Sequence, residues 1–339
     1  MLTKKKRIIL FWLSIGAFAL LLIPVFLYSF GYGVGPGFTI QKTGAIAVTI
    51  SESGASVSVG RAKRKTTSLI SKTALIKNLV PGRYEVVAEK DGFWPWRREL
   101  AVFSERVTVR EILLFPLAVA GTQLGDSIPS PWEERMSKEP YVKRGTLFVS
   151  DETGRMRTLV SSVKKFWALP QSNNFLIWGD DGKFYKNRDA FNPALLLSLS
   201  SGEDHAAEIF TDLLISSKNL FFGEDGDRAV FWDRYSIDSY WIGALDKMPE
   251  WQKEYQHAPA LRLTHIFSAP DILRAVLPYP KEDNYLIVEM QNGIFALEME
   301  FPRNNTAPLY KGKRPTIVSI YENTLLILDE GNFIEIKLP

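Results

Sequence analysis

The sequence predicts an all-β body behind a single N-terminal transmembrane helix. Residues 8–30 carry no charged side chain, whereas most of the chain after them alternates apolar and polar residues between short turn signals. Alternation at period two is typical of half-buried strands. We expect two β domains: a small β-sandwich over residues 44–115 and a β-propeller of about five blades over residues 145–339.

The first 30 residues predict how the chain meets a membrane. As a helix, residues 8–30 rise ~35 Å, enough to cross a hydrocarbon core of ~30 Å. Basic residues Lys4–Arg7 precede this span, and the next basic residue is Lys42. Because positive residues stay on the cytoplasmic side, we expect residues 1–7 to be a cytoplasmic tail. The protein would then be a single-pass protein of the cell membrane, with an extracytoplasmic body.

A cleaved signal peptide is the alternative to an uncleaved anchor. Signal peptides usually have an apolar region of ~7–15 residues followed by a small-x-small cleavage site. The apolar run of this chain is longer, and no Ala-x-Ala site follows it. Both observations favour a retained transmembrane helix.

Composition limits the partners and the chemistry. The chain has 41 Lys and Arg and 38 Asp and Glu, and four of the basic residues lie in the tail, so the body carries a net charge of −1. A near-neutral body disfavours nucleic acid as a partner, because nucleic-acid binding requires a basic face. Cysteine is absent, which excludes disulfides, thiol catalysis and cysteine-ligated zinc.

Residues 31–43 and 44–115 differ in local sequence. The stretch Gly-Tyr-Gly-Val-Gly-Pro-Gly at residues 31–37 predicts a flexible stem. In residues 44–115, Ile46, Val48 and Ile50 alternate with smaller or polar residues, and further strands are expected at residues 84–88, 99–103 and 107–113. Turn signals at Ser-Gly, Pro-Gly and Asp-Gly pairs separate these strands.

Part of this region resembles a known family. Residues 79–86 read Leu-Val-Pro-Gly-Arg-Tyr-Glu-Val, residues 90–93 read Lys-Asp-Gly-Phe, and Trp96 follows closely. In order and spacing these motifs resemble the PEGA domain. The resemblance implies a β-sandwich-like module of surface proteins, often beside a membrane anchor, with a role in binding surface layers or carbohydrate. The Pro-Glu-Gly-Ala tetrapeptide itself is missing, and a basic run replaces the short turn after Val59.

The remaining chain predicts a linker and then repeated β units. Residues 116–144 contain four prolines and are expected to be a linker with one short helix near residues 132–136. A strand, a polar turn, an apolar strand, a glycine turn and another strand recur at residues 166–185, 275–296 and 317–334. Recurrence every ~40–50 residues predicts a β-propeller. It loosely resembles TolB-like and WD40-like propellers, and a pair of β-sandwiches is the structural alternative.

Two groups of residues are candidates for ligand binding. The aromatic residues Trp232, Tyr235, Tyr240 and Trp241 lie close together in the sequence among aspartates, a mixture that can stack a sugar ring and bind its hydroxyls. Packing in blade cores is the alternative.

The second group, Arg61, Lys63, Arg64 and Lys65, is expected at a hairpin tip. It would contact anionic headgroups or wall polymers, each charge contributing ~1 kcal/mol at an anionic surface. A solvated tip is the alternative.

The residues that could carry catalysis form no recognisable motif. His205, His257 and His265 have no spacing that would bring two imidazoles to one metal. The sequence also lacks the serine-hydrolase elbow, the Walker loop and the dinucleotide fingerprint. Acidic turns such as residues 223–227 are interpreted as hairpin turns rather than calcium loops. We therefore expect no catalytic residue, no metal and no cofactor.

These observations favour a non-enzymatic protein that binds or scaffolds at the bacterial cell envelope. The expected partners are the lipid bilayer and a surface glycan, wall polymer or envelope protein. The alternative is an envelope glycoside hydrolase or lyase, whose propeller would carry an acid pair such as Asp233 and Asp238. That chemistry requires two carboxylates ~5–10 Å apart.

Overall fold

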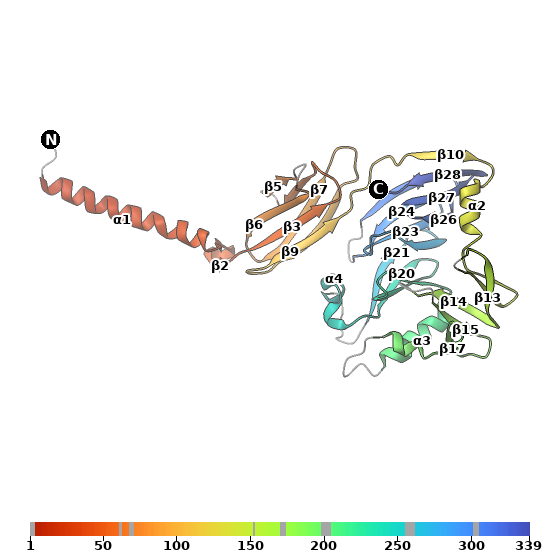
Figure 1. Ribbon diagram of the computed structural model, residues 1–339. Helices are drawn as coiled ribbons and strands as arrows, with labels where there is room; N and C mark the ends of the chain where they lie inside the picture. The colour runs from red at the N-terminus through yellow and green to blue at the C-terminus, as the bar shows by residue number, and fades with distance from the viewer. Residues whose placement is uncertain are drawn as a thin grey trace. The chain divides into compact units, whose positions relative to one another are not determined.

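The chain forms two compact units, residues 1–117 and residues 118–339. The computed structural model describes residues 4–60, 63–67, 71–151, 153–169, 174–197, 205–254, 262–300 and 305–339. Figure 1 shows the elements of both units in chain order. Each unit is mostly β-structure, as the alternation of the sequence predicts.

Helix α1 (Lys4–Ser29) contains the predicted membrane span. Its segment Phe11–Ser29 is long and apolar enough to cross a bilayer, and none of its side chains is buried by the rest of the protein. It is the one helix of this kind among the described residues, and an N-terminal signal sequence would meet the same criteria. Pro24 lies inside the helix, and proline is tolerated in membrane helices.

The glycine-rich segment after α1 is an ordered hairpin and not the flexible stem expected for residues 31–43. Its elements are β1 (Tyr32–Val34), the 3-10 turn η1 (Pro36–Phe38) and β2 (Ile40–Lys42). Strands β1 and β2 pair antiparallel. Thr43 donates from its backbone N–H and from Oγ1 to the carbonyl oxygen of Gly31, at 2.7 and 2.8 Å. These bonds fasten the hairpin to the end of α1.

Two sheets complete the first unit. In one sheet β3 is antiparallel to β6 and parallel to β9, and in the other β4 and β7 lie between β5 and β8. The strands expected at residues 84–88, 99–103 and 107–113 are confirmed as β7, β8 and β9. The bounds are β3 (Gly44–Ile50), β4 (Ser56–Val59), β5 (Lys63–Thr66), β6 (Thr73–Leu79), β7 (Gly82–Glu89), β8 (Trp96–Val102) and β9 (Val107–Ile112).

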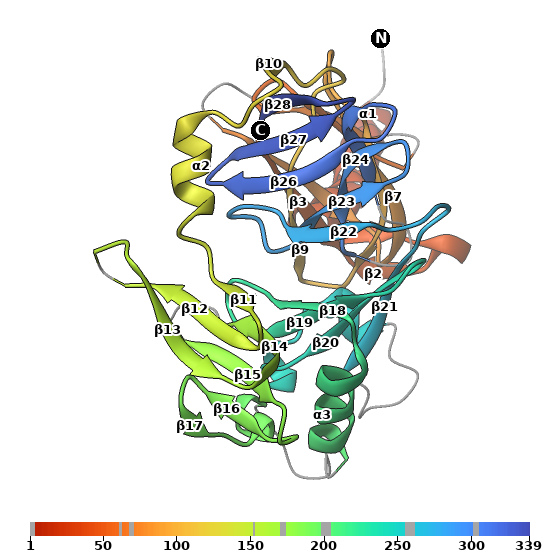
Figure 2. The ribbon, with the colours of Figure 1, turned by 90° about the vertical axis from the view of Figure 1, so that its right-hand side faces the viewer.

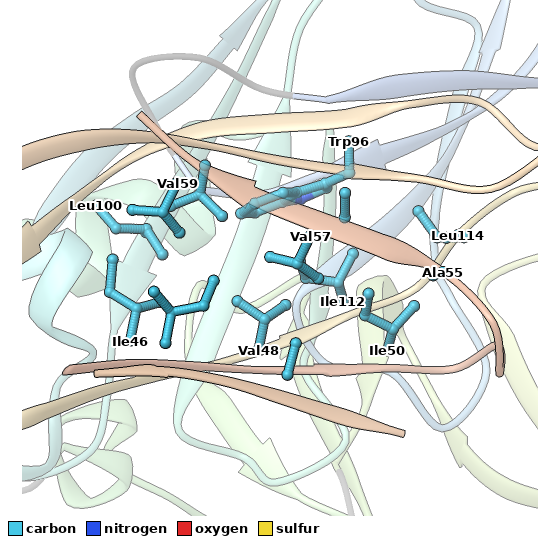
Figure 3. Close-up of a cluster of buried hydrophobic side chains, with 14 of the residues drawn as sticks. Ile46, Val48, Ile50, Ala55, Val57, Val59, Trp96, Leu100, Ile112 and Leu114 are labelled. Atoms are coloured by element: carbon cyan, nitrogen blue, oxygen red, sulfur yellow. The ribbon is translucent and has the colours of Figure 1, made fainter. Parts of the chain in front are cut away.

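One apolar core joins these two sheets. Ile46, Val48 and Ile50 of β3 point toward Val57 and Val59 of β4 (Figure 3), and all five side chains are buried. Side chains two residues apart share one face of a strand, so the alternation read from the sequence becomes this core. Burial of each large aliphatic side chain contributes ~1.5–3 kcal/mol. Trp96 packs in the same core, as the packing alternative for this aromatic requires.

The second unit consists of successive antiparallel sheets. Its described residues form five sheets, which follow one another along the chain from β11 to β28 (Figure 2). The strands of the first three are β11 (Tyr141–Lys143), β12 (Thr146–Ser150), β13 (Met156–Ser161); β14 (Val163–Ala168), β15 (Phe175–Gly179), β16 (Phe184–Lys186), β17 (Asp189–Ala190); and β18 (Asn219–Phe222), β19 (Arg228–Trp232), β20 (Ser236–Trp241), β21 (Leu263–Ser268). The last two contain β22 (Ala275–Pro278), β23 (Tyr285–Met290), β24 (Gly293–Glu298), β25 (Thr306–Lys311); and β26 (Thr316–Tyr321), β27 (Thr324–Asp329), β28 (Asn332–Lys337).

The segment expected to be a linker contributes a strand to the last sheet. Strand β10 (Gly121–Gly125) pairs antiparallel with β28, and Gly121 faces Ile336 in that register. The sheet therefore contains both the first and the last strand of the unit. The short helix expected near residues 132–136 is confirmed as α2 (Ser130–Met136), where Trp132 donates from Nε1 to Glu335 of β28 at 2.8 Å.

Apolar cores lie between consecutive sheets. One core joins Leu147 and Val149 of the first sheet to Ile177 of the second, and another joins Val230 to Val288 across the third and fourth sheets. Packing of four-stranded sheets face to face along the chain is typical of propeller blades. The remaining helical elements are η2 (Pro193–Leu196), α3 (Ala206–Ser216), η3 (Leu245–Lys247) and α4 (Glu250–Glu254).

Candidate functional site

The predicted aromatic cluster is divided between the interior and the surface. Tyr240 and Trp241 are only 2% and 3% exposed. Tyr240 stacks on Phe210 with 5.3 Å between ring centroids and donates its hydroxyl to the carbonyl oxygen of Ala206 at 2.8 Å. Trp241 donates from Nε1 to the carbonyl oxygen of Ala244 at 3.0 Å. Buried rings cannot stack against a ligand, which corrects the sugar-binding interpretation of Tyr240 and Trp241.

The other two aromatic candidates stay nearer the surface. Trp232 ends β19 half-buried, with its ring 6.0 Å from that of Phe221. Tyr235 lies in the turn between β19 and β20 and is 51% exposed. The predicted sugar-binding role of these two residues stays a prediction.

The basic run does not form a hairpin tip as expected, because most of it is an edge strand. Lys63, Arg64 and Lys65 belong to β5, which pairs with β4. Lys65 is exposed and donates from Nζ to the carbonyl oxygen of Leu75 at 3.2 Å. Arg61 lies outside the described residues. Positive charge on an edge strand also discourages pairing with a second chain.

The proposed acid pair is corrected by the surroundings of Asp233. Its Oδ1 accepts the backbone N–H groups of Tyr235 and Ser236 at 2.7 and 2.8 Å. These hydrogen bonds hold the pKa of Asp233 below its usual value. A glycosidase acid needs a raised pKa so that it is protonated near neutral pH. Asp233 is therefore unsuited to that role.

Asp238 belongs instead to a chain of hydrogen bonds that includes a histidine and a serine. Its Oδ1 lies 2.9 Å from Nδ1 of His265, and Nε2 of the same ring lies 2.8 Å from Oγ of Ser268. Its Oδ2 accepts the hydroxyl of Ser236 at 3.2 Å. The side chains of Asp238 and His265 are 24% and 40% exposed, so the group is open to solvent. We call these four residues the β20–β21 network.

An irregular register brings the network together. Strands β20 and β21 pair Ser236 with Ser268 and Asp238 with His265, and Ile266 is an extra residue in β21. Without it, His265 and Ser268 would face opposite sides of the sheet, because they are three residues apart. A bulge shifts the alternation by one residue and re-aims the side chains. Both residues thereby reach the face that carries Ser236 and Asp238.

The network has the order of groups that activates a serine hydroxyl. A carboxylate that accepts from Nδ1–H fixes the histidine tautomer, which leaves Nε2 free to accept the proton of Ser268. A motif search misses this arrangement because it depends on one bulged residue. Of the other histidines, His205 is exposed, with Nδ1 3.6 Å from a carboxylate oxygen of Glu208, and His257 lies outside the described residues.

A second group of charges surrounds Arg228 at the other end of β20. Arg228 is buried, faces Trp241 in the register, and its guanidinium carbon lies 5.6 Å from the centre of that ring. Asp283, in the turn between β22 and β23, has its pKa raised to about 6, because it is partly desolvated and lies beside the carboxyl of Asp225. Within the described ranges, no group of three or more histidine, aspartate or glutamate side chains is arranged to hold a metal ion.

Comparisons with known proteins give this chain no family. No protein-family model matches it, and no curated protein does. Structures of virginiamycin B lyase from Staphylococcus aureus match at 11% and 10% identity, over 91% and 88% of this chain and 98% and 100% of the lyase chains, with TM-scores of 0.30 and 0.31. A structure of a eukaryotic initiation factor matches at 12% identity and a TM-score of 0.28, over 57% of this chain and about half of its own chain, 48%. Likenesses this distant leave the function to be argued from the chain's own residues.

Proposed function

We propose that the chain is a membrane-anchored, non-enzymatic protein of the cell envelope that displays two β domains outside the cytoplasm. In this proposal the first unit is a PEGA-like β-sandwich and the second is a closed β-propeller of five blades. They bind or scaffold a surface glycan, a wall polymer or an envelope protein. One observation carries the proposal: an apolar, unburied helix, Phe11–Ser29, leads directly into two compact β units.

The direction of insertion follows from charge. Four basic residues precede the span, and a cytoplasmic location of these residues would place both β units on the opposite side. The closed propeller is supported by the sheet that joins β10 to β28, because this pairing ties the start of the second unit to its end. The sandwich is supported by the single core between its two sheets.

The absence of cysteine from the chain makes topology directly measurable. Single cysteines at Thr3, Asp91 and Lys247 would report the tail and the two units, and Asp91 and Lys247 are exposed. In spheroplasts we expect a membrane-impermeant maleimide to label Asp91→Cys and Lys247→Cys at once, and Thr3→Cys only after permeabilisation. The reverse pattern would show that the body is cytoplasmic. Loss of residues 1–30 from the mature protein would show a cleaved signal peptide.

The β20–β21 network supports a second candidate function, the hydrolysis of an ester or activated acyl substrate. In that reaction Oγ of Ser268 would attack the carbonyl carbon while His265 takes the hydroxyl proton at Nε2. Asp238 would orient the ring and stabilise its positive charge. The proton then passes to the leaving alcohol, and water releases the acyl group from the serine.

A fluorophosphonate probe tests this second function. The probe should label the full-length protein at Ser268, as peptide mass spectrometry would show, and Ser268→Ala and His265→Ala should abolish labelling. Ser236→Ala is the matched control, because Ser236 contacts Asp238 but neither nitrogen of His265. An unlabelled wild-type protein, or equal labelling of Ser268→Ala, would leave the network with a structural role only.

A further inference from the structure

The hairpin β1–β2 carries apolar side chains that the protein leaves exposed. Val34, Phe38 and Ile40 are 65%, 91% and 60% exposed. Exposed apolar surface costs roughly 25 cal/mol per Å² relative to burial. A small hairpin with so much of it would be expected to have a cover that the chain itself does not provide.

Phe38 at the tip also has an unfavourable backbone conformation. Its φ is +60°, in the left-handed region that asparagine, aspartate and glycine tolerate better than a bulky aromatic residue. A strained residue that buries nothing within its own fold suggests a function outside that fold. The strain therefore points to a role for the ring itself.

Chain length decides what can cover the hairpin. Strand β1 begins at Tyr32, three residues after the end of α1 at Ser29, so it starts within ~11 Å of the helix end. The bonds from Thr43 to Gly31 hold the other end of the hairpin at the same point. Figure 1 shows β2 directly beside the end of α1. If α1 spans a bilayer, the hairpin must lie at its surface.

The exposed apolar surface continues on the neighbouring turn between β8 and β9. The backbone N–H of Glu105 in this turn donates to the carbonyl oxygen of Thr43 at 3.0 Å, and its carboxylate pairs with Lys42. On either side of it, Phe103 and Val107 are 57% and 53% exposed. Aromatic and apolar side chains with a nearby lysine are typical of the membrane–water interface.

We propose that the β1–β2 hairpin inserts into the headgroup region of the leaflet at the C-terminal end of α1, with Phe38 as the deepest residue. This inference rests on the proposed membrane anchoring. The occupant is lipid, because the hairpin cannot leave the bilayer surface by more than the few residues that join it to the helix. Insertion holds the first unit against the membrane through two contacts, the helix and the hairpin.

Fluorescence quenching in vesicles tests the proposal on the full-length chain. Single cysteines at Val34, Leu21 and Asp91 would carry a bimane label in vesicles of phosphatidylcholine and phosphatidylglycerol. We expect nitroxide-labelled lipids to quench the labels at Val34 and Leu21, and aqueous iodide to quench the label at Asp91, which is exposed beyond the far end of β7.

A second variant separates insertion from folding. Phe38→Asn removes the apolar tip but suits the left-handed backbone, so it preserves the hairpin. It should lower the ratio of inserted to free hairpin about 10-fold or more, and thus reduce lipid quenching at Val34 while leaving Leu21 unchanged.

The outcomes distinguish this inference from the anchoring on which it rests. Quenching of Leu21 by lipid together with iodide quenching of Val34 would overturn the insertion of the hairpin alone. Iodide quenching of Leu21 as well would overturn the membrane anchoring. Unchanged lipid quenching at Val34 in Phe38→Asn would show that the tip residue does not drive insertion.

Discussion

The two ends of strand β20 differ more than two ends of a six-residue strand usually do. At its C-terminal end, Tyr240 and Trp241 are buried between packed elements. At its N-terminal end, Ser236 and Asp238 join a network that solvent reaches. Aromatic residues close together in the sequence suggested a binding surface, yet most of the accessible chemistry of this strand lies in its polar residues.

The difference shows how burial on both faces defeats an argument from sequence proximity. Neighbouring residues of a strand point to opposite faces, so Tyr240 and Trp241 would not both be buried in a sheet with one wet face. Tyr240 packs with α3 residue Phe210, whereas Trp241 meets Arg228 and the loop after β20. Both faces of this end of the strand are covered.

The largest expected effect is at the buried end. Tyr240→Ala should lower the free energy of unfolding by ~3–5 kcal/mol, because it removes a fully packed aromatic side chain and leaves a cavity. Tyr240→Phe keeps the ring and removes only the hydroxyl, so it should cost ~1–3 kcal/mol through the unpaired carbonyl of Ala206. Denaturant unfolding would measure both. A smaller loss for Tyr240→Ala than for Tyr240→Phe would contradict the described packing.

A smaller effect is expected in the β20–β21 network. Asp238→Ala should cost ~0.5–1.5 kcal/mol, the usual contribution of hydrogen bonds that are partly exposed. The ring of His265 would then lose the partner that fixes its tautomer. NMR of the imidazole nitrogens would detect this as a mixture of tautomers, and a single tautomer retained in Asp238→Ala would show that Asp238 does not orient the ring.

The charges beside the buried end predict a weak pH dependence. The pKa of Asp283 is raised to about 6 in the folded protein, so the folded state binds this proton more tightly than the unfolded chain does. The stabilisation is complete below the unfolded pKa near 4 and is lost as pH rises through about 6. Because Asp283 is partly exposed, solvent screening should keep the effect below ~1 kcal/mol.

Thermal unfolding of wild type and Asp283→Asn from pH 4 to pH 7 would reveal this contribution. The melting temperature of Asp283→Asn should fall less across this range than that of the wild type. Parallel curves for the two proteins would show that Asp283 does not titrate in this window. Lys281→Ala, an exposed change in the same turn, serves as the matched control.

The smallest stability effect is expected for Tyr235. Its ring is exposed in the turn between β19 and β20, so Tyr235→Ala should change the free energy of unfolding by less than ~0.5 kcal/mol. If this ring stacks on a sugar, the same variant should still lose signal on a glycan array probed with the detergent-solubilised full-length protein. Equal glycan binding by both proteins would remove Tyr235 from the binding surface.

Sequence patterns predicted the strands of the first unit well because alternation and turn chemistry act locally. The β7 strand, for example, follows a Pro-Gly turn and alternates until Asp91-Gly92. The network at β20 and β21 escaped prediction for the opposite reason. It depends on one extra residue, Ile266, in a pairing between strands that are separated by more than 20 residues.

The segments around the two units were harder to interpret than the strands inside them. Residues 31–37 have the composition of a flexible stem, but hydrogen bonds from Thr43 close them into a hairpin. Residues 116–144 have the prolines of a linker, yet β10 pairs with a strand more than 200 residues away. Local composition does not record such distant partners.

The pairing of β10 with β28 also has a consequence in time. During synthesis β10 emerges long before its partner, Asn332–Lys337, which contains almost the last residues of the chain. The final sheet can be completed only when the whole chain has left the ribosome. Pairing over such a sequence separation is slow, so the second unit should complete its fold after translation, with β10 as the last strand to find its place.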